Sequence, residues 1–197
     1  MKAQESRYTM TKRHHTETYK KAKKEGKMDK EFIPICDYIA KTEDYFTSSC
    51  CAGRITLVGL DKNESKKESA FHRKWHRKVS FTEIKEGIES YNGDTLWFKQ
   101  EPLIFHLGTN NLLNAKKILV VCEKAGMKRA GIKAAKEGKF IIEMVGTHNI
   151  NVPIREKQKT IISDEFLLYI VKKANEKFVK NQLMLKNLEK EIKKNLK

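Results

Sequence analysis

The chain has 197 residues, 39% of them hydrophobic, and a formal net charge of +16. This length fits one large domain or two small halves that share a core, and the hydrophobic content argues against global disorder. No apolar run has the length of a membrane-spanning helix, and the first thirty residues hold no apolar core of a signal peptide, so we expect a cytoplasmic protein with no membrane contact.

The first half of the chain is expected to begin with helices and to continue into a strand. Residues 1–12 are polar and expected to be loosely ordered, and residues 13–24 favour a basic helix that ends near Gly26. Apolar residues at positions 32, 35, 36 and 39 predict an amphipathic helix over residues 29–40, with Pro34 in its first turn. A loop that begins at residue 47, a strand at 54–60 and a charged loop at 62–69 follow.

The second half alternates helices and strands. Ser80 and Glu83 form a capping box that starts a helix through about Tyr91, and Asn92-Gly93 is a turn signal. Ser163 is expected to cap a long, basic C-terminal helix whose end, rich in lysine and leucine, extends past the body. Between them we expect strands at 96–98 and 103–107, a helix at 112–124 closed by Gly126, and strands at 128–135, 140–145 and 150–154.

This alternation predicts a mixed α and β fold. Ala-Gly stands beside a strand start at residues 52–55 and again at 130–133, a weak repeat compatible with a duplicated α/β unit. Neither a Gly-x-Gly-x-x-Gly fingerprint nor a Walker loop is present, so nothing supports a Rossmann-type enzyme. We therefore expect a single domain of two related halves, at about 28–109 and 110–197, with a basic arm at 1–27 and a basic helix from about 163.

The positive charge points to a polyanionic partner, which would gain affinity through counterion release. A lysine-rich surface of the kind found in thermophiles is the alternative. The four cysteines Cys36, Cys50, Cys51 and Cys122 contain no Cys-x-x-Cys pair, so we expect no metal and no disulfide.

Three segments carry candidate chemistry. Thr-Ser-Ser-Cys-Cys-Ala-Gly-Arg-Ile at residues 47–55 offers hydroxyls, a glycine and an arginine to an anionic or zwitterionic ligand, although serine and glycine are also common in a turn before a strand. In the basic segment 71–79, Trp75 could stack on a base or anchor the core, while His72 and His76 lack a third metal ligand. In segment 97–106, His106 is either a core histidine or a group that orients a substrate nitrogen.

Taken in order, these segments resemble the archaeal and eukaryotic methyltransferase family that acts third in tRNA wybutosine synthesis. The matches span about residues 32–154 and begin with Ser-Ser-Cys-Cys-Ala-Gly-Arg-Ile, where the family usually reads Ser-Ser-Cys-Ser-Gly-Arg. They continue through Lys74-Trp75-His76, Trp-Phe-Lys-Gln-Glu-Pro-Leu-Ile-Phe-His at 97–106, Ala-Gly-Met-Lys-Arg-Ala-Gly-Ile at 125–132, and Val152-Pro153. Cys51 and Ala130 depart from the serines that the family has at those positions.

The resemblance implies transfer of a methyl group from S-adenosylmethionine to a ring nitrogen of a 4-demethylwyosine-type base. That base lies 3′ of the anticodon in phenylalanine tRNA. It also implies duplicated α/β halves with mixed sheets, outside the Rossmann class, and requires no metal. The sites expected from residue chemistry and matched positions are catalytic residues His106 and Glu101, cofactor-binding residues Ser48, Ser49, Gly53, Arg54 and Trp75, and substrate-binding residues Lys74, His76, Lys99 and Arg129.

Two other functions remain open from the residues alone. The charge, together with the lack of a familiar cofactor motif, fits a non-catalytic basic RNA-binding module. Paired cysteines beside Arg54 would suit a thiol enzyme, if the pKa of Cys50 or Cys51 were depressed. A monomer and a homodimer are equally compatible with the sequence.

Overall fold

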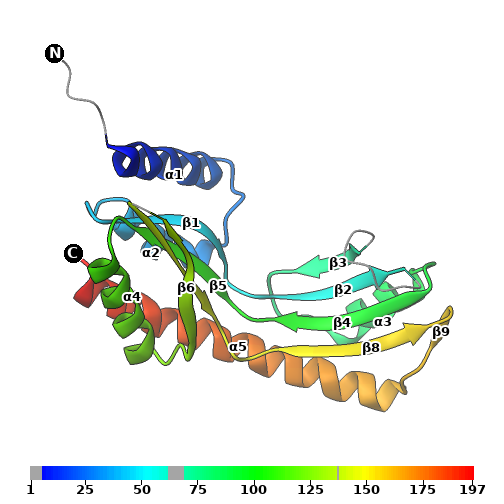
Figure 1. The fold of residues 1–197 in the computed structure, drawn as a ribbon. Helices are drawn as coiled ribbons and strands as arrows, with labels where there is room; N and C mark the ends of the chain where they lie inside the picture. The colour runs from blue at the N-terminus through cyan, green and yellow to red at the C-terminus, as the bar shows by residue number, and fades with distance from the viewer. Residues whose placement is uncertain (1–5, 62–68, 137) are drawn as a thin grey trace. The chain divides into compact units, whose positions relative to one another are not determined.

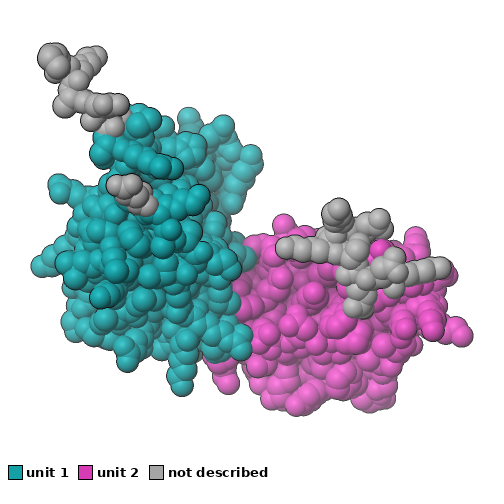
Figure 2. Space-filling model, viewed as in Figure 1, with its two compact units in different colours: residues 1–52, 103–147, 182–197 teal, residues 53–102, 148–181 magenta. Residues whose placement is uncertain are grey.

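The computed structural model describes residues 6–61, 69–136 and 138–197, and the chain divides into two compact units. Unit 1 comprises residues 1–52, 103–147 and 182–197, and unit 2 comprises residues 53–102 and 148–181 (Figure 2). Each unit is thus assembled from separate chain segments, whereas contiguous halves were expected. The duplication behind that expectation stays a prediction. None of the helices in the described ranges combines the length and apolarity needed to cross a membrane.

Unit 1 is a four-stranded sheet with helices (Figure 1). The strand order is β1-β5-β7-β6, and every pair is antiparallel. Its elements are α1 (Arg7–Lys24), η1 (Lys30–Phe32), α2 (Ile33–Ile39), β1 (Tyr45–Cys51), β5 (Ile104–Thr109), α4 (Leu112–Lys124), β6 (Arg129–Lys136) and β7 (Lys139–Val145).

Unit 2 is built on a five-stranded antiparallel sheet of order β3-β2-β4-β8-β9. Its elements are β2 (Arg54–Leu60), β3 (Ala70–Trp75), α3 (Phe81–Glu89), β4 (Thr95–Glu101), β8 (Ile150–Glu156) and β9 (Lys159–Thr160). The long helix α5 (Asp164–Asn195) contributes its first part, to residue 181, to unit 2 and the remainder to unit 1.

The mixed α and β fold expected from the sequence is confirmed, as is its place outside the Rossmann class. The sheets are antiparallel in all described pairs rather than mixed, because no connection crosses over to lay one strand parallel to its neighbour. One face of each sheet is apolar and packs on helices, as alternating strands require. In unit 2 that face carries Ile55, Leu57, Leu96, Phe98 and Ile154.

Helix α1 begins six residues earlier than predicted, at Arg7 rather than Arg13. Ser6 caps it by accepting a hydrogen bond from the backbone of Thr9, at 3.2 Å, so the expectation of loose order was wrong for residues 6–12, while residues 1–5 lie outside the described residues. Tyr19, only 6% exposed, anchors the helix, and its hydroxyl donates to Asp37 at 2.6 Å.

The segment expected to be a loop from residue 47 is largely strand β1. Its pairing with β5 shifts between Thr47 and Ser49, so Ser48 is an extra residue at a bulge. The small polar residues that suggested a loop are compatible with a strand because Ser48 and Ser49 are exposed. Strand β2 has the predicted bounds, and the charged loop predicted at 62–69 lies outside the described residues except for Ser69.

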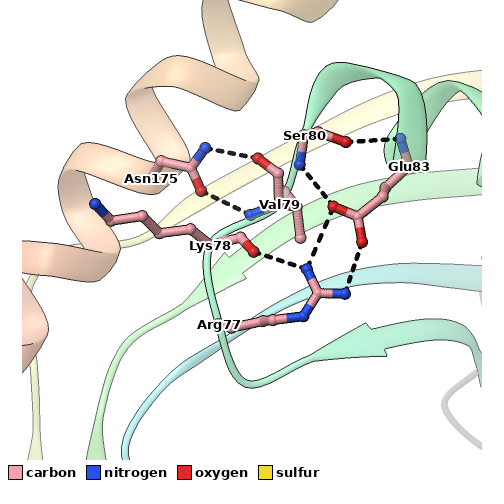
Figure 3. A network of polar contacts seen from close by, with 6 residues as sticks. All are labelled: Arg77, Lys78, Val79, Ser80, Glu83 and Asn175. Carbon is pink, nitrogen blue, oxygen red and sulfur yellow. Dashed lines mark hydrogen bonds and ion pairs between the residues drawn. The ribbon is translucent and has the colours of Figure 1, made fainter.

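The entry to α3 is fixed by the predicted capping box (Figure 3). Glu83 N donates to Ser80 Oγ at 3.1 Å, and Ser80 N donates to the Glu83 carboxylate at 2.8 Å. Arg77 also pairs with that carboxylate at 2.6 Å. Asn175 of α5 bonds both the N–H and the carbonyl of Val79, at 3.0 and 2.8 Å, which ties the loop to the helix.

Ser163 caps α5 as predicted, by accepting from Phe166 N at 3.2 Å. The end of the helix does not extend past the body. Its apolar residues Leu185, Leu188 and Ile192, with Leu196 beyond it, are 0–2% exposed in the core of unit 1, because they recur on one stripe.

Candidate active site

A row of polar side chains crosses the sheet of unit 1. Ser49 of β1, His106 of β5 and Glu143 of β7 are direct cross-strand partners and therefore lie on one face. Ser49 Oγ lies 2.8 Å from His106 Nδ1, and His106 Nε2 lies 2.9 Å from the Glu143 carboxylate. Lys133 of β6 reaches the other carboxylate oxygen at 3.2 Å. We call Ser49, His106, Glu143 and Lys133 the relay.

The relay sets the direction of its hydrogen bonds. A carboxylate only accepts, so in the neutral ring His106 Nε2 carries the proton and Nδ1 accepts the Ser49 hydroxyl. The hydrogen bond from His106 holds the pKa of Glu143 below its usual range, with Lys133 adding to the effect and burial opposing it. Ser49 is exposed and His106 is 19% exposed, so the serine is the end that a substrate would meet.

A pocket of about 190 Å³ lies beside the relay, between α1 and β1. Strand β1 contributes Ser48 and Ser49 of the 47–55 segment, which we call the signature residues, and α1 contributes a wall that the sequence did not indicate. The lining residues are His15, Thr18, Tyr19, Ala22, Met28, Cys36, Thr47, Ser48, Ser49 and Cys50. Helix α1 itself packs on β1, and His15 stacks on the Phe46 ring at 4.7 Å.

The two candidate catalytic residues occupy different units. His106 belongs to the relay in unit 1, while Glu101 in unit 2 is directly opposite Arg54 and forms an ion pair with it. The Arg54 guanidinium also lies over the Phe71 ring, 4.5 Å from its centroid. Gly53, which precedes Arg54, has a φ of +97°, a backbone conformation that residues other than glycine rarely adopt.

The remaining predicted residues are distributed over three strands. Trp75 is half-buried and packs against the apolar core of unit 2, next to α3. Lys74 lies 5.7 Å from the Phe71 ring centroid and Lys99 lies 5.4 Å from that of Trp97. His76 is exposed directly after β3, and Arg129 is exposed at the first position of β6.

The structure assigns two relay residues that sequence reasoning did not select. Glu143 was detectable in principle, because it stands between the buried residues Ile142 and Met144 and so must face away from the core. Lys133 carried no such signal, since it is one of many lysines. His72 lies in a strand and not on a helix, and its Nε2 lies 2.9 Å from the Gly87 carbonyl oxygen and 3.2 Å from Ser90 Oγ.

The raised pKa of the Cys50 thiol argues against a thiol enzyme that uses this residue. A hydrogen bond with Cys36, together with burial, raises the pKa of the Cys50 thiol well above its ordinary value. A thiol nucleophile needs the opposite shift, which stabilises the thiolate. Burial likewise raises the pKa of Cys122, to about 12.

Comparison with known proteins identifies relatives over nearly the whole chain. The family described as Methyltransferase TYW3 matches residues 5–194. A Pyrococcus horikoshii protein named tRNA(Phe) 7-((3-amino-3-carboxypropyl)-4-demethylwyosine(37)-N(4))-methyltransferase 1 is 32% identical over 188 residues, which covers 90% of this chain and 96% of the relative. An Archaeoglobus fulgidus protein named as such a methyltransferase is 32% identical over 171 residues, 87% of this chain and 86% of its own.

A solved structure agrees with the sequence comparison. The structure of a protein from Pyrococcus horikoshii superimposes with a TM-score of 0.88 at 30% identity, covering 94% of this chain and 95% of that one.

Proposed function

The chain belongs to the methyltransferase family described as Methyltransferase TYW3, and from that premise we propose that it transfers a methyl group from S-adenosylmethionine to a ring nitrogen of a 4-demethylwyosine-type base in phenylalanine tRNA. The relatives' names state the tRNA, the base and the N(4) position. The observation that carries the proposal in this chain is the Ser49–His106–Glu143 relay at the edge of the pocket lined by the signature residues. Family membership does not favour a non-catalytic RNA-binding module.

The reaction replaces an N–H bond of the base by an N–CH3 bond, so a proton must leave the nitrogen. S-adenosylmethionine supplies, when bound, a methyl group already activated on a sulfonium. The exposed Ser49 hydroxyl meets the substrate N–H, and its own proton passes to His106 Nδ1 as the substrate proton moves to the serine oxygen. Glu143 fixes the ring and stabilises the positive charge that His106 then carries.

The pocket residues fit part of the methyl donor. A volume of about 190 Å³ is below the 300–1,000 Å³ typical of sites for drug-sized ligands. Ala22 and Met28 give an apolar wall suited to the aliphatic part near sulfur, and the Thr47 and Ser48 hydroxyls can bond its polar amino-acid end. We place that part of the donor in the pocket and its nucleoside outside.

The other expected roles remain proposals. Arg54 and Glu101 form an ion pair. A ligand carboxylate could bind Arg54 in place of Glu101, or a ligand amine could bind Glu101 in place of Arg54. Lys74, His76, Lys99 and Arg129 are proposed to contact the substrate RNA, and the cofactor-binding role expected of Gly53 and Trp75 stays a proposal, with Trp75 half-buried against the core of unit 2. The cytoplasmic location and the choice between monomer and homodimer stay predictions.

The proposal is tested by incubating the protein with methyl-labelled S-adenosylmethionine and precursor phenylalanine tRNA, followed by mass spectrometry of the nucleosides. One added methyl on the tricyclic base is expected, and none on tRNA that lacks the tricycle. Calorimetry tests donor binding separately. Donor binding without any methyl transfer to the precursor would contradict the proposal.

A further inference from the structure

The sheet of unit 2 has a second face, opposite its apolar core. Residues that are paired across antiparallel strands share a face, so the register defines rows of side chains. Val58 of β2 is paired with Phe71 of β3 and with Trp97 of β4, and Trp97 is paired with Pro153 of β8. We call Phe71, Val58, Trp97 and Pro153 the aromatic row.

A cationic row lies next to the aromatic row. Thr56, two residues before Val58, is paired with Lys74 and with Lys99, and Lys99 is paired with Asn151. The two rows are therefore about 7 Å apart along the strands. Each aromatic ring has a lysine near it, Lys74 at 5.7 Å from Phe71 and Lys99 at 5.4 Å from Trp97.

The helices of unit 2 pack on the other side of this sheet. The core that includes α3 and α5 residues takes Ile55, Leu57 and Phe98 from the strands, which alternate with the residues of the two rows. Phe71, in the aromatic row, is 49% exposed. An exposed aromatic on a sheet face with lysines around it is an arrangement suited to a ligand that is both flat and anionic.

Charge on this face favours a polyanion. The Arg54 guanidinium also lies over Phe71, but its charge is balanced by Glu101, the acid opposite it in the sheet, so Lys74 and Lys99 supply the net positive charge of this face. Thr56, between the two lysines, is fully buried, and its hydroxyl has no hydrogen-bond partner among the described residues.

We propose that the open face of the unit 2 sheet binds single-stranded RNA, with unpaired bases stacked on Phe71 and Trp97 and phosphates on Lys74 and Lys99. The inference rests on the proposed function, in which the substrate is a tRNA, and identifies where unit 2 holds unpaired nucleotides such as those of the anticodon loop. Stacking on aromatic rings is open to every base, so the face provides affinity and orientation rather than sequence readout. The pairing of β3 with β2 shifts between Arg73 and Phe71, and this bulge at His72 puts Trp75 on the core face and Phe71 on the opposite face.

The test measures binding of a labelled RNA hairpin that carries the anticodon loop, and of the same stem closed into a full duplex, by fluorescence anisotropy. Phe71→Leu and Trp97→Leu are each expected to raise Kd for the loop roughly tenfold and to leave duplex binding nearly unchanged. The double variant Lys74→Ala/Lys99→Ala is expected to lower the slope of log Kd against log salt by about 1.4, about 0.7 for each phosphate contact.

The chain offers a matched control on α5. Tyr169, 56% exposed, lies with Lys173 5.7 Å from its ring centroid, the same type of pair in the same unit but on a helix. Tyr169→Leu and Lys173→Ala should therefore leave loop binding unchanged. Circular dichroism and thermal unfolding of each variant identify any that fail to fold.

The outcomes separate this inference from the proposed function. Face variants that bind the loop as tightly as wild type, or that lose loop and duplex binding equally, overturn the RNA-binding face even if the wild-type protein methylates tRNA. Absence of methyl transfer by the wild-type protein would overturn the proposed function, while selective loss of loop binding in the face variants would still support the face.

Discussion

Nε2 of His106 lies 2.9 Å from the Glu143 carboxylate, although the two residues are 37 positions apart in the chain. The contact joins the central strands β5 and β7, and its other end reaches Ser49. One imidazole therefore connects a partly exposed carboxylate to an exposed hydroxyl on the same face of the sheet, which is the arrangement that a proton-accepting site requires.

The relay predicts non-additive effects of its members on methyl transfer. Ser49→Ala, His106→Gln and Glu143→Gln should each lower kcat about 100-fold, the lower end of what general base catalysis contributes. Because the three act as a unit, Ser49→Ala/His106→Gln should be little worse than either single change. Single-turnover rates at saturating tRNA and donor measure this. Multiplicative losses would show that the residues act independently.

Helix α1 should control binding of the methyl donor rather than the chemical step. Tyr19→Phe keeps the ring in the core but removes the hydroxyl that donates to Asp37, at a cost of about 1.5–3 kcal/mol. Since α1 forms one wall of the pocket, KM for the donor should rise with little change in kcat. Lys23→Ala is the milder control, because it removes a half-exposed ion pair to the same Asp37 and should lower the free energy of unfolding by no more than about 1 kcal/mol. An unchanged KM for the donor in Tyr19→Phe would show that α1 does not contribute to the donor site.

Two glycines in the unit 1 sheet should differ in how much stability they lose when replaced by alanine. A Cβ at Gly108 would lie 2.1 Å from Cζ of Phe46, a ring that is 1% exposed and stacked on His15. Gly108→Ala should therefore cost about 1–3 kcal/mol of unfolding free energy. A Cβ at Gly131 meets no heavy atom within 4 Å, so Gly131→Ala should change stability by no more than about 0.5 kcal/mol. Urea unfolding compares the two, and equal losses would contradict the packing at Phe46.

Glu83 should make part of the free energy of unfolding depend on pH. The Arg77 guanidinium, with the backbone N–H of Ser80, lowers the pKa of Glu83 from 4.5 to about 2. A carboxyl with a depressed folded-state pKa stabilises fully above its unfolded pKa, and the stabilisation is lost as pH falls through the folded value. The stability difference between wild type and Glu83→Gln should thus be largest above pH 5 and disappear near pH 2.

Because the pair is partly exposed, the Glu83 contribution should not exceed about 1 kcal/mol. Ser80→Ala, which removes the cap hydroxyl, should lower the free energy of unfolding by about 1 kcal/mol, and this loss should depend much less on pH. Urea titrations from pH 2 to 7 supply both curves. A wild-type advantage that grew toward low pH would exclude the ion pair as its source.

Much of the secondary structure was predictable because its signals are short-range. The capping box at Ser80, the Ser163 cap and the strand at Arg54–Leu60 all follow from neighbouring residues. The main error, the loop expected from residue 47, arose because small polar residues look alike in a turn and in a bulged strand. The start of α1 was missed for a similar reason, since its polar first turns have little hydrophobic periodicity.

The sequence by itself determined the family, the helix caps and the signature residues, because each depends on residue identity and local spacing. Only the tertiary structure decided which of those residues meet. Cross-strand register paired His106 with Glu143 and Arg54 with Glu101, and the bulge in β3 at His72 directed Trp75 to the core and Phe71 to the open face. Register and bulges are set by packing between segments far apart in the chain, and a shift of one residue reverses every side chain, so local patterns do not specify them.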